Sequence, residues 1–143
     1  MNYDSQDGTI LVVDDNHDIC AFAKRVLEAA GYGVVTAAGG AEALRFYTAQ
    51  HLYAERHLCR DHPSEIVLLL TDVAMPDING FELADRVLEM NSQLPVLFMT
   101  GGVWRPYRGL ECIAKPFRSA ELLEKVRRVL HENTHPERTA PAA

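Results

Sequence analysis

The sequence predicts an α/β domain in which five parallel strands form one doubly wound sheet. Five short apolar segments alternate with helical patterns along the 143 residues, and this alternation is typical of a parallel sheet covered by helices on both faces. The segment 66–76 (IVLLLTDVAMP) contains the clearest strand, because its unbroken apolar run suits burial on both faces. Right-handed crossovers limit such a chain to a few doubly wound topologies, and the strand order 2-1-3-4-5 is one of them.

Each expected strand ends where polar or turn-forming residues interrupt an apolar run. The central run leads into Asp72, and Pro76 then forces the chain out of any regular element, because proline lacks a backbone donor and restricts the residue before it. Similar interruptions follow the other strands, with Gly39-Gly40 after the second and Gly101-Gly102 after the fourth. The expected strands are 9–13, 34–37, 66–70, 96–99 and 112–114.

Apolar residues at helical spacing predict a helix between successive strands. The first helix has the strongest stripe: Ile19, Phe22, Ala23, Val26, Leu27 and Ala30. Gly31 is its expected stop. A weaker stripe predicts a long second helix from about residue 41 to about residue 59, and the third helix follows Gly80. Ser119 is the expected N-cap of the last helix, whose stripe is Leu122, Leu123, Val126, Val129 and Leu130.

Composition argues against several classes of partner and location. The net charge of -6 does not suit a nucleic-acid backbone as the main partner. The longest apolar run is far short of the roughly 20 residues that span a membrane, and the polar N-terminus (MNYDSQDG) does not resemble a signal peptide. Cys20, Cys59 and Cys112 show no C-x-x-C spacing, which suits reduced thiols. We therefore expect a cytoplasmic protein without direct nucleic-acid or membrane partners.

The functional signal is a set of polar residues at the ends of the expected strands: Asp14 and Asp15, Asp72, Thr100 and Lys115. In an open parallel sheet, ligands bind outside the carboxyl ends of the strands where the strand order reverses. Three carboxylates that meet there repel one another, and a hard divalent cation such as Mg²⁺ relieves the repulsion. Phosphoryl transfer needs such positioning and charge neutralisation. Asp72 is therefore a candidate nucleophile that forms an aspartyl-phosphate.

Each of these residues also has an ordinary structural interpretation. Asp14 and Asp15 could cap the first helix, and capping by Asn16 is compatible with both interpretations. Asp72 could be a turn residue at a strand end, and Lys115 could be a solvated lysine before a turn. Their combination at one predicted edge of the sheet favours the functional interpretation.

Four motifs in order make the chain resemble the receiver domain of two-component response regulators. The matching segments are LVVDD (11–15), LLLTDVAMPDINGFEL (68–83), VLFMTG (96–101) and AKPF (114–117). The resemblance covers about residues 9–130 and implies a flavodoxin-like, CheY-like fold with the strand order 2-1-3-4-5. We expect a stand-alone receiver domain at 1–132, a flexible tail at 133–143 and no attached effector domain.

The resemblance also implies a role for each site residue. Asp72 would accept a phosphoryl group from a sensor histidine kinase or a histidine phosphotransfer protein. Mg²⁺ would be bound by Asp15 directly, by Asp14 largely through water, by Asp72 and by the Ala74 backbone carbonyl. Thr100 would follow the phosphoryl group, and Lys115 would pair with it. The Lys115–Pro116 bond would be cis, as the family usually has it. The output would be a changed surface rather than enzymatic turnover.

Three features depart from the usual receiver pattern. Cys112 stands three residues before the lysine, where receivers usually carry a Tyr or Phe that swings inward with the threonine. The span from Thr100 to Lys115 is short by roughly two helical turns, so the fourth helix should be stunted or irregular. The segment between the second and third strands is longer than usual by about three to four helical turns, so the second helix should be extended.

These departures leave alternative functions open. The first hypothesis is a switch of protein–protein interactions driven by phosphorylation. A second is a constitutive interaction module on a receiver scaffold, and a third is a phosphorelay intermediate or phosphate sink.

Some residues outside this set also have two interpretations. His51, His57, Cys59 and His62 are metal-capable but match no ligand spacing that we can name, so a partly exposed helix is the favoured interpretation. Trp104 and Tyr107 could anchor a partner, but such residues more often cover the edge of a core. Cys112 could be a redox handle, although a small buried thiol is favoured.

Overall fold

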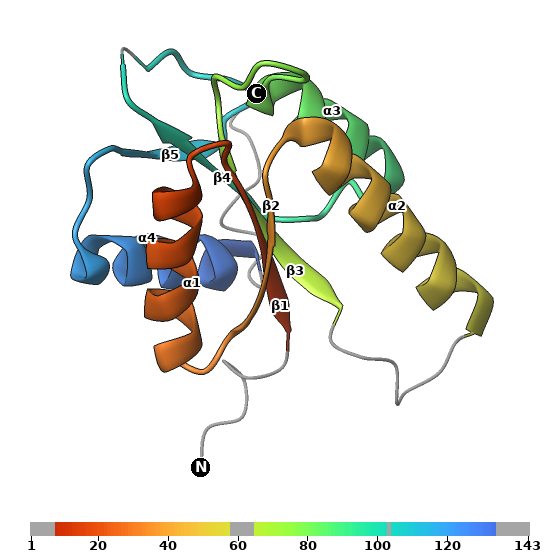
Figure 1. The fold of residues 1–143 in the computed structure, drawn as a ribbon. Coiled ribbons are helices and arrows are strands. Elements are labelled where there is room, and N and C mark those ends of the chain that lie inside the picture. Colours follow the sequence, from red (N-terminus) through yellow and green to blue (C-terminus); the bar gives the residue numbers. More distant parts are fainter. Residues whose placement is uncertain (1–7, 58–64, 103, 134–143) are drawn as a thin grey trace.

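A single sheet of five parallel strands lies at the centre of the molecule (Figure 1). The computed structural model describes residues 8–57, 65–102 and 104–133, with the backbone only for 54–57 and 133. The strand order is β2-β1-β3-β4-β5, and every neighbouring pair is parallel. The strands are β1 (Thr9–Val13), β2 (Gly33–Ala37), β3 (Ile66–Asp72), β4 (Val96–Thr100) and β5 (Glu111–Ala114). The predicted doubly wound sheet and its strand order are therefore confirmed.

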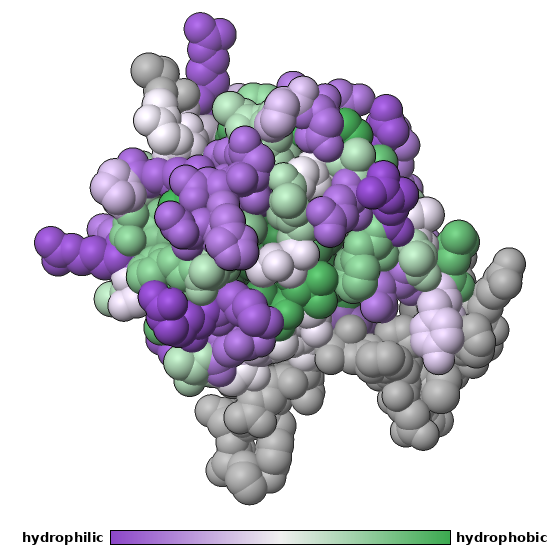
Figure 2. Space-filling view, viewed as in Figure 1, coloured by the Kyte–Doolittle hydropathy of each residue, from purple (hydrophilic) through white to green (hydrophobic). Residues whose placement is uncertain are grey.

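Helices cover both faces of this sheet (Figure 1). On one face α1 (His17–Ala29) contacts α4 (Ser119–Asn133), and on the other α2 (Gly40–His57) contacts α3 (Gly80–Met90). No other helix lies in the described part of the chain. Figure 2 shows hydrophilic side chains over α1, on the side of this helix that faces away from the sheet. The arrangement is the α/β/α sandwich that alternating strands and helices predict.

The two faces of the sheet have separate cores, because successive residues of a strand point to opposite faces. In β1, Ile10 and Val12 pack beneath α1 and α4, whereas Leu11 and Val13 pack beneath α2 and α3. All four side chains are fully buried. This two-sided burial explains why the central strands have unbroken apolar runs.

The helix ends agree with the predicted caps at the first helix but not at the last. The Asn16 side chain accepts hydrogen bonds from the amides of Asp18 and Ile19, and Gly31 has φ 101° after α1. The prediction that Ser119 caps the last helix is wrong by one residue. Ser119 is the first helical residue, and the carbonyl of Arg118 accepts the first helical bond from Leu122. The Arg118 amide donates instead to Glu121, three residues on, as the glutamate of a capping box does.

The expected stunted fourth helix is absent from the described residues between β4 and β5. In its place Tyr107 and Leu110 form a bridge around a tight turn. Arg108 and Gly109 have φ 55° and 72° in this turn, a conformation that glycine adopts without strain and arginine does not. Pro106 and Gly109 oppose helix formation here. The prediction that this segment is stunted or irregular is therefore confirmed.

The extended second helix is confirmed as far as the structure describes it, because α2 has 18 residues and reaches His57. The predicted histidine–cysteine cluster falls largely outside the described residues, since Cys59 and His62 lie there. The expected tail also lies outside them, except for its first residue, Asn133. The boundaries of the receiver domain therefore remain a prediction.

Candidate functional site

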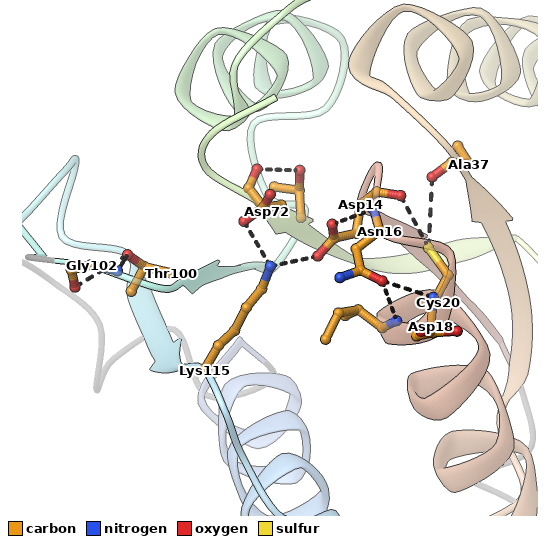
Figure 3. Close-up of polar contacts among 11 residues, drawn as sticks. Asp14, Asn16, Asp18, Cys20, Ala37, Asp72, Thr100, Gly102 and Lys115 are labelled. Atoms are coloured by element: carbon orange, nitrogen blue, oxygen red, sulfur yellow. Dashed lines mark hydrogen bonds and ion pairs between the residues drawn. The ribbon is translucent and has the colours of Figure 1, made fainter. Parts of the chain in front are cut away.

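The predicted site residues converge where the carboxyl ends of the strands meet (Figure 3). Asp14 directly follows β1, Asp72 ends β3 and Lys115 directly follows β5. Lys115 Nζ lies 2.8 Å from Asp14 Oδ2 and 3.2 Å from Asp72 Oδ1. A single ammonium therefore bridges two carboxylates that are 58 residues apart in the chain (72 − 14).

The three predicted acidic ligands also lie together. Carboxylate oxygens of Asp14, Asp15 and Asp72 come within 4.8 Å of one another. Asp14 and Asp72 are buried, with 1% and 7% of their surface exposed, whereas Asp15 is exposed. Among the described residues, the buried Oδ2 of Asp14 has no hydrogen-bond donor apart from the Lys115 ammonium. Oxygen ligands of this kind at one open edge fit a hard cation such as Mg²⁺.

Burial and charge set the ionisation of the two central groups. Burial raises the pKa of the Asp72 carboxyl, the Asp14 charge raises it further, and the Lys115 ammonium offsets only part of this effect. For Lys115, burial acts to lower the pKa, but the hydrogen bonds and charges of Asp14 and Asp72 outweigh it, so the pKa is raised. Lys115 therefore stays protonated, beside a carboxylate that is more basic than usual.

Backbone contacts between the start of α3 and the end of β3 hold Asp72 in position. The Gly80 amide donates to the Val73 carbonyl at 2.8 Å. A Cβ atom at Gly80 would lie 2.3 Å from the Asp72 carbonyl oxygen, so no other residue fits without movement of β3 or α3. The glycine that begins α3 thus allows the close approach that fixes the end of β3.

The other two predicted site residues lie at the same edge but make different contacts. The Thr100 hydroxyl accepts the Gly102 amide at 3.2 Å and lies on the side of Lys115 away from Asp14 (Figure 3). Ala74 lies exposed in the turn two residues beyond Asp72. The metal-binding role of its carbonyl remains a prediction.

Cys112 and the two aromatic residues of the short segment share one core. Cys112 lies opposite Phe98 in the β4–β5 register and packs, half-buried, against the core beneath α2 and α3. Burial raises the pKa of its thiol. Trp104 and Tyr107 pack on the same core, so the structure supports the interpretation that they cover its edge.

Sequence reasoning missed three residues that hold the surroundings of the site. Cys20 donates its thiol to the carbonyls of Asp14 (3.4 Å) and Ala37 (3.9 Å), and burial and then the Asp14 charge raise its pKa to about 11. Asp77 caps the start of α2, and Asp85 binds the segment after β4. Asp77 follows Pro76, a turn signal that could have marked it. Asp85 had no local signal.

Comparison with known proteins identifies the family. The family model of the response regulator receiver domain matches residues 10–127, and the chain therefore belongs to this family. It is 30% identical over 128 residues to the response regulator receiver protein CpdR of Brucella abortus, covering 85% of this chain and 95% of CpdR. The Lys115–Pro116 peptide is cis, as the resemblance implied.

Two further relatives show the range of this similarity. The transcriptional regulatory protein PrrA of Mycobacterium tuberculosis is 34% identical over 128 residues, which are 85% of this chain but 49% of PrrA. The chain thus spans about half the length of this regulator. The response regulator TrrA of Thermotoga maritima, solved in complex with Mg²⁺ and BeF, has a TM-score of 0.67 and 28% identity over 85% of this chain and 98% of TrrA.

No helix among the described residues combines the length and the apolar character that crossing a bilayer requires.

Proposed function

We propose that this receiver domain accepts a phosphoryl group on Asp72 and thereby switches protein–protein interactions. The observation that carries the proposal is the Asp14–Lys115–Asp72 arrangement, in which an ammonium lies 3.2 Å from the candidate nucleophile. The donor would be a sensor histidine kinase or a histidine phosphotransfer protein. Receiver domains interact with such kinases, but the particular donor belongs to the proposal.

In the proposed reaction, a carboxylate oxygen of Asp72 attacks the phosphorus of a phosphohistidine. An O–P bond forms, the N–P bond breaks, and the imidazole nitrogen leaves with the bonding electrons. Lys115 neutralises charge on the transferred group, and the Thr100 hydroxyl donates to one of its oxygens.

A divalent cation completes this proposal. Asp14, Asp15 and Asp72, with the Ala74 carbonyl, would hold Mg²⁺, which would neutralise charge on the carboxylates and on the phosphoryl oxygens. The three carboxylates within 4.8 Å of one another support this role, and TrrA was solved with Mg²⁺ and BeF.

The test is labelling by a small phosphodonor such as acetyl phosphate, followed by intact mass spectrometry. We expect labelling with Mg²⁺, no labelling with excess EDTA and none in Asp72→Asn. The matched control is Asp18→Asn, since Asp18 is an exposed aspartate on α1, and it should label like the wild type. Failure of the wild type to label with any donor or kinase contradicts the proposal.

The location and the absence of catalytic turnover form part of the same proposal. Cys20 and Cys112 are free thiols, which suits the reducing cytoplasm. The bound phosphoryl group would act as a signal, so we do not propose that the chain is an enzyme acting on a separate substrate.

A constitutive interaction module is the second candidate function. Cys112 at the usual aromatic position and the non-helical segment after β4 favour it. This candidate predicts that partner affinity does not depend on phosphorylation. A change in partner affinity on adding beryllofluoride, a phosphoryl mimic, would exclude it.

A further inference from the structure

Residues 104–110 lie against α3 through stacked aromatic rings. The Tyr107 ring stacks on Phe81 with centroids 4.3 Å apart and planes at 24°. Trp104 lies 5.6 Å from the Phe98 ring and 6.1 Å from the Phe81 ring. Phe81 begins the inner face of α3 and Phe98 lies in β4. The segment therefore bridges the central sheet and α3.

One carboxylate on α3 ties this segment down. Asp85 Oδ2 accepts the Tyr107 hydroxyl at 2.7 Å, and Asp85 Oδ1 lies 3.1 Å from the Arg108 guanidinium. The Asp85 and Arg108 side chains are 40% and 51% exposed, so solvent screens their attraction and the ion pair is weak. The contacts of Asp85 with Tyr107 and Arg108 have a defined geometry, but breaking them costs little free energy.

The near end of the segment is attached to the candidate phosphorylation site. Thr100 and Phe98 are two residues apart in β4, so their side chains leave the same face of the strand. The Thr100 hydroxyl accepts the Gly102 amide at 3.2 Å. A Thr100 side chain that turns toward a phosphoryl group on Asp72 gives up this bond to Gly102, two residues before the segment. The change occurs beside Phe98, on which Trp104 packs.

We propose that Asp85 is a latch that holds residues 104–110 on α3 until Asp72 is phosphorylated. In the latched state, Tyr107 and Arg108 bind Asp85. In the released state, Thr100 binds the phosphoryl group and the contacts of Asp85 with Tyr107 and Arg108 open. This inference rests on the proposed function and names the route by which its signal leaves the site.

The latch has one energetic requirement, and the Asp85 contacts meet it. A signal must favour one of two states by more than the cost of breaking the contacts of the other. A hydrogen bond contributes roughly 1 kcal/mol, which corresponds to about a fivefold change in an equilibrium constant. The partly exposed Asp85 contacts are in this range, so a phosphoryl group that binds Thr100 and Lys115 can outweigh them.

Trp104 is the single tryptophan of the chain, and its fluorescence reports on the packing of the segment that the latch holds. The experiment measures its fluorescence in the full-length chain during titration with beryllofluoride in Mg²⁺. We expect the emission of the wild type to shift on saturation. In Tyr107→Phe, which keeps the ring but loses the hydroxyl bond, the emission should be shifted before addition. Half-saturation should then need roughly fivefold less beryllofluoride.

Two further variants complete the design. Tyr32→Phe makes the same chemical change in the core beneath α1 and α4 and should titrate like the wild type. Asp85→Asn removes the charge that Arg108 binds, and it should behave like Tyr107→Phe. It also replaces that variant if loss of the Tyr107 hydroxyl prevents folding.

The outcomes separate the latch from the function on which it rests. Unchanged Trp104 emission while ¹⁹F NMR shows bound beryllofluoride overturns the latch and leaves the proposed function standing. The latch is also overturned if Tyr107→Phe and Asp85→Asn reach half-saturation at the same beryllofluoride concentration as the wild type. Absence of both beryllofluoride binding and Asp72 labelling overturns the proposed function, and the latch with it.

Discussion

At the scale of single residues, the site is a balance of charges that the fold enforces. Lys115 is shared between Asp14 and Asp72, at 2.8 and 3.2 Å, and both carboxylates are buried. Burial raises the pKa of Asp72, and the Asp14 charge raises it further because one ammonium cannot fully compensate two acids. The folded protein thus holds an excess of negative charge where a cation and a phosphoryl group are proposed to bind.

Burial of Asp72 and this excess charge predict that Asp72→Asn is more stable than the wild type when no Mg²⁺ is present. The pKa of Asp72 is raised on folding, chiefly by burial and then by Asp14. The folded state therefore binds more protons than the unfolded state, and this group's contribution to stability falls as pH rises from the unfolded pKa through the folded pKa. Thermal melting at pH 7 in EDTA should give a higher Tm for the variant. A lower Tm would contradict the prediction.

Gly80 gives a steric prediction at the same site. Gly80→Ala places a Cβ 2.3 Å from the Asp72 carbonyl oxygen, so β3 or α3 must shift. Such overpacking costs about 1–3 kcal/mol, and the displaced Asp72 should be phosphorylated more slowly. Urea unfolding and labelling rates measure the two effects. Gly101→Ala is the matched control for stability, because its Cβ would meet nothing within 4 Å, and equal losses in both variants would refute the steric account.

At the scale of elements, contacts between distant segments hold the helices that surround the site. Asp77, in the turn after β3, accepts hydrogen bonds from the amides of Gly40 and Ala41 at 3.2 and 2.9 Å. These amides begin α2 and have no partners within the helix. The loop that leaves Asp72 therefore also determines where α2 starts.

Asp77 gives a pH-dependent prediction. Hydrogen bonds, first from the Ala41 amide, hold the pKa of its carboxyl below the ordinary value. Its stabilising contribution is therefore present above the unfolded pKa of about 3.9 and is lost as pH falls through the lower, folded pKa. In an NMR titration, the Gly40 and Ala41 amide shifts should move in that acidic window. The same window should be silent in Asp77→Asn, and persistence of the transition there would show that another group causes it.

At the scale of the whole molecule, the sheet couples the metal site to folding. Asp14 and Asp72 come from different strands, so their joint geometry exists only in the folded chain. A ligand that binds only the folded state stabilises it by about 2.7 kcal/mol at 100 times its Kd. Ion binding and global stability are therefore expected to be linked.

Removal of Mg²⁺ tests this linkage. Saturating Mg²⁺ should raise the Tm of the wild type by several degrees relative to EDTA. Asp15→Asn removes an exposed carboxylate of the set and should lose most of this gain, whereas Asp18→Asn should retain it. Equal gains in all three proteins would mean that the cation binds elsewhere.

The features that could be predicted from the sequence are those that follow a local pattern. Strands, helices and the residues at strand ends follow from local apolar patterns, because burial of one face imposes a period of two or 3.6 residues. Together with the strand order, those patterns predicted that Asp14, Asp72 and Lys115 lie at the same edge of the sheet. The error at Ser119 is a one-residue shift of a helix start, where the Arg118 carbonyl rather than the serine marks the cap.

Sequence by itself therefore determined the fold and the group of aspartates at the carboxyl ends of the strands, since both depend on the spacing of residues along the chain. Only the tertiary structure decided that the described residues between β4 and β5 form no helix and that Asp85 binds Tyr107 and Arg108, 22 and 23 residues away. Such contacts leave no periodic signal. They form because packing of Trp104 and Tyr107 on Phe81 brings the segment onto α3, which no local pattern specifies.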